Sequence, residues 1–104
     1  MEFIETTLFT KHLYEVLTED EYVALQNTLI ERPDAGDIIQ GTGGLRKIRV
    51  GQATKGKRGG ARVIYYWITA DYKIYLMAIY TKNQQADLTP RQKQLLSDAI
   101  KEFK

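Results

Sequence analysis

The strongest constraint on the fold is a two-residue alternation that runs from about residue 45 to residue 80. Side chains of a strand point to opposite faces in turn, so this period predicts strands. Within residues 45–50, Lys47 and Arg49 alternate with Ile48 and Val50, and residues 61–69 and 72–80 are rich in β-branched and aromatic residues. The tight connection at Ala70 and Asp71 predicts antiparallel neighbours. Residues 51–60, with four glycines, are expected to form a flexible loop.

Helical patterns flank these strands. Thr18 followed by Glu21 is a capping-box pattern that predicts a helix start, and Thr89 followed by Pro90 and Gln92 predicts another. An earlier helix is expected from the spacing of apolar residues between 8 and 17, after a short strand at residues 3–6. The second helix is expected to bury Tyr22, Leu25 and Leu29, with Val23 and Ile30 widening the stripe. The last helix is expected to pack on the sheet through Leu95, Leu96, Ala99, Ile100 and Phe103.

The expected fold class is therefore α+β, with the element order β-α-α-β-β-β-α. A small antiparallel sheet would pack against the N-terminal helices and the C-terminal helix. Both faces of residues 61–69 carry apolar side chains, so each side of the sheet must be covered at least in part. The 104 residues, of which 43% are hydrophobic, are expected to form one domain over residues 1–104.

Composition excludes several classes of protein. Cysteine is absent and histidine occurs once, so we expect no disulfide framework, no metal site and no cofactor. No apolar run approaches the roughly 20 residues that span a bilayer, and the first residues lack a signal-peptide pattern. We therefore expect a cytoplasmic protein without membrane contact.

Charge is distributed unevenly along the chain. Residues 1–37 hold nine acidic and two basic residues, whereas residues 38–70 hold seven basic residues and no acidic one. A solvated surface usually mixes charges of both signs, so this acid-free segment indicates a polyanionic ligand, with nucleic acid as the first candidate. Its basic residues are Arg46, Lys47, Arg49, Lys55, Lys57, Arg58 and Arg62.

The alternation places Lys47 and Arg49 on one face of their strand, and Arg62 begins the neighbouring strand. Several cations can therefore converge on one phosphate. RNA cleavage by its own 2′-hydroxyl needs a base, cations for the phosphorane and a proton for the leaving oxygen. Arginine suits the second task, and a lysine or tyrosine in such a positive field is expected to have a lowered pKa and to exchange protons. A basic face that docks RNA without catalysis explains these residues equally well.

Two other patterns are given no catalytic role. Residues 51–57 match the start of a phosphate-binding loop, but Arg58 stands where serine or threonine would bind magnesium, and a strand follows where a helix should begin. A nucleoside triphosphatase is therefore rejected. His12 is expected to be a surface or boundary residue, far in sequence from the basic segment.

Three segments carry a specific resemblance: residues 41–49 (GTGGLRKIR), residues 56–66 (GKRGGARVIYY), and residues 80–83 (YTKN) with Asp87 and Leu88. Together they resemble the HigB-like branch of the RelE toxins, densely from about residue 36 to residue 88. The resemblance implies a ribosome-dependent, metal-free messenger RNA endoribonuclease that acts in the decoding site. It also implies a cognate antitoxin, HigA-like and DNA-binding, and direct DNA contact only through that antitoxin.

The resemblance also implies roles for single residues. Lys47 and Arg49 fall on the two strand cations of the RelE active site, Arg62 on the phosphate-binding arginine and Lys82 on the lysine after the last strand. Asn83 replaces an arginine found in many RelE proteins, and no residue matches their C-terminal tyrosine. Tyr80 could replace that tyrosine as stacking platform or acid, although a core position is equally compatible with its strand. Arg46, Lys55, Lys57 and Arg58 are expected to contact RNA or the ribosome.

Overall fold

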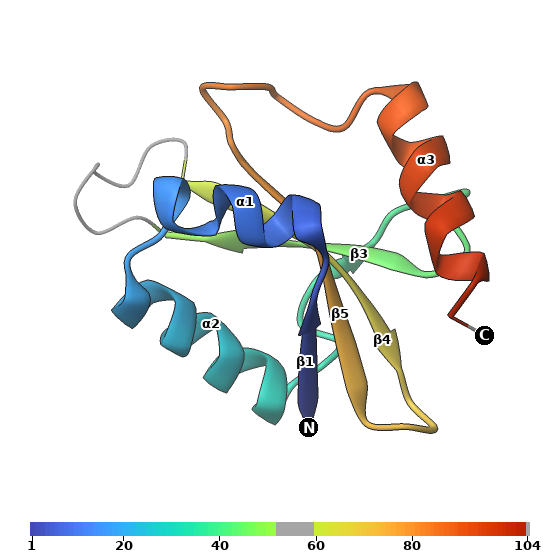
Figure 1. Cartoon of the computed structure of the whole chain (residues 1–104), viewed down its shortest axis with the longest axis horizontal. Coiled ribbons are helices and arrows are strands. Elements are labelled where there is room, and N and C mark those ends of the chain that lie inside the picture. Colours follow the sequence, from blue (N-terminus) through green and yellow to red (C-terminus); the bar gives the residue numbers. More distant parts are fainter. Residues whose placement is uncertain (52–59, 104) are drawn as a thin grey trace.

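The computed structural model describes residues 1–51 and 60–103 and contains a five-stranded sheet with three helices (Figure 1). The α+β class expected from the sequence is confirmed, and the predicted element order is observed with one short strand added. The elements are β1 (Glu2–Glu5), α1 (Thr7–Val16), α2 (Glu19–Glu31), β2 (Asp37–Ile38), β3 (Leu45–Val50), β4 (Ala61–Ile68), β5 (Lys73–Thr81) and α3 (Pro90–Lys101).

The strands are arranged in the order β1-β5-β4-β3-β2. The β3–β4 and β4–β5 pairs are antiparallel, as their short connections predicted. The sheet as a whole is mixed, because β1 pairs with β5 in parallel. The added strand β2 pairs with β3 at the edge of the sheet, and its two residues are too few to show an alternation in sequence.

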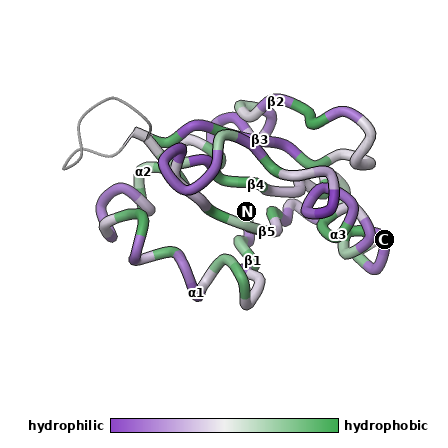
Figure 2. Tube along the Cα trace, turned by 90° about the horizontal axis from the view of Figure 1, so that it is seen from above, coloured by the Kyte–Doolittle hydropathy of each residue, from purple (hydrophilic) through white to green (hydrophobic). Residues whose placement is uncertain are grey.

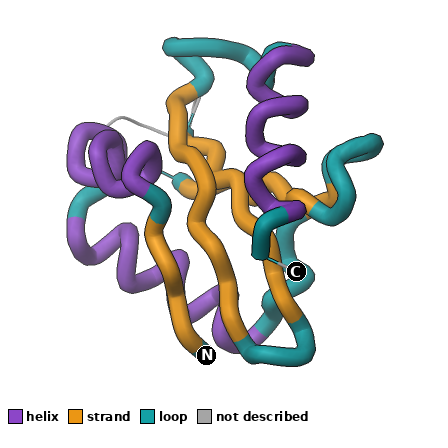
Figure 3. The backbone as a smooth tube through the Cα atoms, turned by 45° about the vertical axis from the view of Figure 1, so that its right-hand side comes forward, coloured by secondary structure: helices purple, strands orange, loops and turns teal. Residues whose placement is uncertain are grey.

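Helices cover both faces of the sheet, as the sequence predicted (Figure 3). One face packs against α1 and α2, and we call the buried residues there the α1/α2 cluster. The other face packs against α3 in what we call the α3 cluster. Strand β4 alternates between them, since Val63 and Tyr65 belong to the α1/α2 cluster while Ile64 and Tyr66 contact the α3 cluster.

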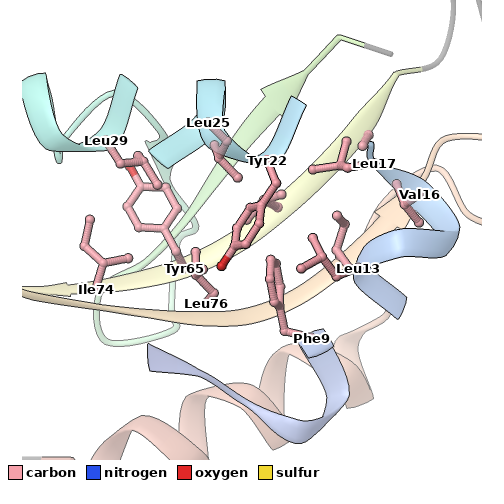
Figure 4. Close-up of a cluster of buried hydrophobic side chains, with 13 residues drawn as sticks. Phe9, Leu13, Val16, Leu17, Tyr22, Leu25, Leu29, Tyr65, Ile74 and Leu76 are labelled. Carbon is pink, nitrogen blue, oxygen red and sulfur yellow. The ribbon is translucent and has the colours of Figure 1, made fainter. Parts of the chain in front are cut away.

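Tyr65 joins the centre of the sheet to the turn after α2. Its ring lies fully buried in the α1/α2 cluster, near Leu29 of α2 and Ile74 of β5 (Figure 4). The hydroxyl donates to the Pro33 carbonyl at 2.7 Å and accepts from the Gly36 amide at 2.8 Å. Burial raises the pKa of this hydroxyl, so it keeps its proton at neutral pH and both hydrogen bonds are maintained.

Both predicted capping boxes are present. The Thr18 hydroxyl accepts from the Glu21 amide at 3.1 Å, and the Glu21 carboxylate accepts from the Thr18 amide at 2.8 Å. Thr89 and Gln92 make the same pair of bonds at the start of α3, at 3.1 and 2.9 Å. These bonds satisfy amides that would otherwise lack partners at each helix N-terminus.

The helices bury narrower stripes than the sequence predicted. Tyr22, Leu25 and Leu29 are buried as expected, but Val23 and Ile30 are about half exposed. Leu95, which was expected to pack on the sheet, is 57% exposed. Each helix presents only one side to the sheet, and hydrophobic and hydrophilic residues therefore alternate along the helical tubes (Figure 2). In the described parts of the chain, no helix is both long and apolar enough to cross a membrane.

We predict that Gly36→Ala destabilises the protein. A Cβ at this position would lie 2.7 Å from Tyr65 Cε1 and 3.0 Å from the Lys47 carbonyl oxygen. Both neighbours are held by the fold, so overpacking should cost about 1–3 kcal/mol. Urea denaturation followed by circular dichroism measures the loss. Gly51→Ala is the matched control, because a Cβ at that position would have no described atom within 4 Å; equal stability of the two variants would contradict the prediction.

Candidate functional site

Strand register brings predicted catalytic residues from three strands together. Arg49 on β3 lies opposite Arg62 on β4, and Arg62 lies opposite Tyr80 on β5. Directly opposed residues of antiparallel strands share one face, so these three form a row across the sheet. Lys47 lies two residues before Arg49 and shares its face, whereas Ile48 contacts the opposite α1/α2 cluster. The predicted common face of Lys47 and Arg49 is therefore confirmed.

A β-bulge decides that Tyr80 joins this row. The register between β4 and β5 shifts between Ile64 and Tyr65, so that Met77 has no direct partner. Leu76 lies in the α1/α2 cluster, and simple alternation from it would place Tyr80 there as well. Because the bulge inserts one residue, Tyr80 instead belongs to the α3 cluster, on the face of Arg62.

The row lies where β3 ends and β4 begins, on both sides of residues 52–59. On the same face, α3 packs over Leu45 and Ile64, which belong to the α3 cluster. Arg49 is exposed and Arg62 partly exposed, so both residues reach the surface of the molecule at the row. The predicted ligand-binding residues Lys55, Lys57 and Arg58 lie outside the described residues.

Lys82 directly follows β5 and is exposed. Its backbone amide donates to the Gly60 carbonyl at 3.5 Å, beside the start of β4. Gly60 is two residues before Arg62, so the backbone of Lys82 borders the row. All five residues predicted to be catalytic, Lys47, Arg49, Arg62, Tyr80 and Lys82, thus occupy one end of the sheet.

Asp87 is a further member of the site that sequence reasoning assigned no role. Its Oδ1 accepts from Lys47 Nζ at 3.2 Å and from the Leu88 amide at 2.8 Å. Partial burial would raise the pKa of this carboxyl, but the Leu88 amide and the Lys47 ammonium together lower it below its ordinary value of 3.8. Asp87 lies six residues after the end of β5, and no local pattern indicates that its loop returns to β3.

Tyr80 combines a core position with a polar group in the site. Its side chain is 6% exposed, so the ring offers no face on which a base could stack. Among the described side chains, its hydroxyl is the buried polar group without a well-formed hydrogen bond, and the Asp87 carboxylate lies close enough to interact with it. Burial raises the pKa of Tyr80, Asp87 raises it further, and Arg62 offsets only part of this. The lowered tyrosine pKa expected from the positive field was wrong, because desolvation outweighs the cation.

Arg46 lies apart from the other cations. It alternates onto the α1/α2 side of β3, where Nη1 donates to the Gly36 carbonyl at 2.7 Å and to the Asp34 carbonyl at 3.3 Å. These bonds hold the turn that Tyr65 also fixes. The RNA contact expected of Arg46 stays a prediction, and its observed partners give it a structural task.

His12 lies on α1, where its Nδ1 is 3.1 Å from the Glu15 carboxylate, and it was assigned no role from sequence. Within residues 1–51 and 60–103, no three histidine, cysteine or acidic side chains gather closely enough to hold a metal ion. The residues that could bind a ligand at the row are lysines and arginines, which are positively charged and donate hydrogen bonds. Their chemistry suits a phosphate group.

The fold and the site define a small α+β protein with arginines and lysines arranged around one end of its sheet. Comparison with known families matches residues 6–104 to the family described as the RelE toxin of the RelE/RelB toxin–antitoxin system. The chain belongs to this RelE toxin family. It is accordingly a translation-inhibiting toxin with an antitoxin partner, in a family whose members are generally endoribonucleases.

We predict that Asp87→Asn keeps the fold and costs little stability. The Asp87 and Lys47 side chains are 49% and 33% exposed, so solvent screening limits their ion pair to about 0.2–1 kcal/mol. Because the folded-state pKa is lowered, this contribution is present above pH 3.8 and is lost as the pH falls through the folded value. Urea denaturation measures the free energy of unfolding of Asp87→Asn and of the unaltered protein. The difference between the two free energies should be smaller at pH 3 than at pH 7. A difference that grows on acidification would contradict this assignment.

Proposed function

We propose that the chain is a ribosome-dependent, metal-independent endoribonuclease that cleaves translated messenger RNA in the decoding site. The RNA's own 2′-hydroxyl would attack the adjacent phosphate. The observation that carries this proposal is the direct opposition of Arg49 and Arg62 on neighbouring strands, with Tyr80 opposite Arg62. We further propose a single cytoplasmic domain of the HigB-like branch, restrained by a HigA-like, DNA-binding antitoxin.

Opposed arginines favour an anion between them. Cβ atoms of directly opposed residues in antiparallel strands lie about 4.5–5.5 Å apart, and like charges in such pairs are destabilising. A phosphate placed between Arg49 and Arg62 would convert this repulsion into attraction. The planar guanidinium group matches two phosphate oxygens at once, which also fixes the orientation of the phosphate.

The same arrangement suits the transition state of cleavage. Negative charge grows on the phosphorane oxygens, and rigid cations aimed at them stabilise it without having to reorganise. Arg62 lies inside the sheet, so its backbone is fixed by β3 on one side and β5 on the other. Lys47 would supply a further contact to the phosphate, and the exposed Lys82 can donate a proton to the leaving 5′-oxygen. Tyr80 keeps its proton at neutral pH, but its buried hydroxyl would have to become exposed to the substrate to serve as this donor.

The ribosome would supply the alignment of the RNA. In-line attack requires the 2′-oxygen, the phosphorus and the leaving oxygen to be held in one geometry, and such positioning contributes several powers of ten to a rate. Arg49 and Lys82 are exposed at the end of the sheet and leave a bound strand free to rotate. Codon and transfer RNA held in the decoding site would remove this freedom.

We predict that the purified protein cuts message inside the reading frame on programmed 70S ribosomes and leaves naked RNA nearly intact. Primer extension with and without ribosomes measures both. Stalled ribosomes on intact message would instead favour a non-catalytic inhibitor that uses the same cations. Equal degradation of naked and ribosome-bound message would contradict the dependence on the ribosome.

We predict that Arg62→Ala lowers the cleavage rate on toxin-saturated ribosomes by a factor on the order of 10², the usual size of one transition-state contact. Single-turnover kinetics measures the rate, and circular dichroism checks folding. Arg32→Ala is the matched control, because Arg32 is an exposed arginine at the C-terminal end of α2. A normal rate for Arg62→Ala would remove Arg62 from the active site.

A further inference from the structure

The site needs a group that can take a proton as well as groups that give one. Lysine and arginine side chains carry only donors, and an ionised carboxylate carries only acceptors. Among the described residues around the row, Lys47, Arg49, Arg62 and Lys82 belong to the first kind. Asp87 is the carboxylate that contacts them, through its 3.2 Å bond to Lys47.

We propose that Asp87 is the general base that accepts the proton of the attacking 2′-hydroxyl, an inference that rests on the proposed function. The geometry supports it because both hydrogen bonds of the carboxylate, from Lys47 and from Leu88, end on Oδ1. The Tyr80 hydroxyl interacts with the same carboxylate, and the proposal requires a substrate hydroxyl to bind at Oδ2 beside it. Lys47 lies two residues from Arg49 on the same face, so a phosphate at the row brings the adjacent ribose close to the carboxylate.

The proposed step balances without a further reactant. The 2′-O–H bond breaks and its proton moves to Asp87, while the 2′-oxygen forms a bond to phosphorus. The bond from phosphorus to the 5′-oxygen breaks, and the leaving oxygen takes a proton from the ammonium group of Lys82, whose side chain is exposed beside the row. The products are a 2′,3′-cyclic phosphate and a 5′-hydroxyl end, after which Asp87 loses its proton and Lys82 regains one from solvent.

The loop that carries Asp87 is held from two sides. Gln85 Nε2 donates to the Asp87 carbonyl at 2.9 Å and to Gln92 Oε1 at 2.8 Å. Gln92 also caps α3, since the same oxygen accepts from the Thr89 amide. The carboxylate is thereby tied to the start of a helix and, through Lys47, to β3. A base fixed in this way meets the positional requirement of proton transfer.

Three titratable groups act on Asp87 from the elements around it. They are Lys47 on β3, Tyr80 on β5 and Lys93 on α3. The two lysines and the Leu88 amide lower the pKa of Asp87, so the carboxylate stays ionised wherever intact ribosomes can be assayed. Cleavage by the unaltered protein should therefore show no loss from protonation of this base between about pH 6 and pH 8.

A positioning role for Asp87 makes different predictions. If the carboxylate only held Lys47 in place, its removal would have no further effect once Lys47 was replaced. If it takes the proton, its removal slows cleavage in both backgrounds. Removal of the base also leaves hydroxide as the proton acceptor, which changes the pH profile.

The experiment is single-turnover cleavage on programmed ribosomes from pH 6 to pH 8. Asp87→Asn should be slower by about 10²-fold to 10⁴-fold at pH 7, and its rate should rise about tenfold per pH unit. The same exchange should slow Lys47→Met. Formate should partly restore Asp87→Ala by replacing the lost carboxylate. Asp98→Asn on α3 is the matched control, expected to cut normally because its partners are Gln94 and Lys101.

The outcomes separate this inference from the proposed function. Cleavage by the unaltered protein with an equal rate for Asp87→Asn overturns the inference alone. The inference is also overturned if Asp87→Asn no longer slows cleavage once Lys47 is replaced by methionine. It is overturned as well if Asp87→Asn keeps the pH profile of the unaltered protein and formate does not restore Asp87→Ala. Absence of any cleavage by the unaltered protein, while ribosomes still stall, overturns the endoribonuclease and the general base together.

Discussion

The burial of β4 on both faces is the constraint on which the rest of the molecule depends. One face of this strand lies under α1 and α2 and the other faces α3, so a single strand takes part in both hydrophobic clusters. Tyr65 of this strand also holds the turn after α2, because its hydroxyl accepts a hydrogen bond from the Gly36 amide. The Gly36 carbonyl accepts a further bond from Arg46. The first residues of the same strand carry Arg62 to the open end of the sheet. Stability and site geometry therefore share one element.

The site is an electrostatic compromise. Arg49 and Arg62 are held face to face by strand register, although like charges in this position cost free energy. One carboxylate, Asp87, enters through a loop and binds Lys47, and a buried tyrosine hydroxyl lies beside them. Opposed cations next to a buried hydroxyl with a raised pKa are typical of functional sites.

Much of the fold was predictable because its signals are local. Thr18 and Thr89 each belong to a capping box of only four residues, which predicted the start of a helix. In residues 45–50, the order of basic and apolar residues predicted which side chains share a face of the strand. The parallel pairing of β1 with β5 was not predictable, because the sequence of a four-residue strand does not indicate whether its partner runs parallel or antiparallel to it. The exposed Leu95 was misjudged for a related reason: helical spacing shows that a stripe exists but not how wide a neighbour covers it.

The sequence by itself determined the three helices, the strands other than β2, the acid-free segment and the common face of Lys47 and Arg49. Each of these depends on residues a few positions apart, whose geometry follows from backbone periodicity. Only the tertiary structure decided that Tyr80 lies beside Arg62, because a bulge in β5 reverses the alternation there. It also decided that Asp87 reaches Lys47, 40 positions earlier, and that burial raises the pKa of Tyr80. Register, loop return and desolvation arise from contacts between distant segments, and such contacts exist only once the chain is packed.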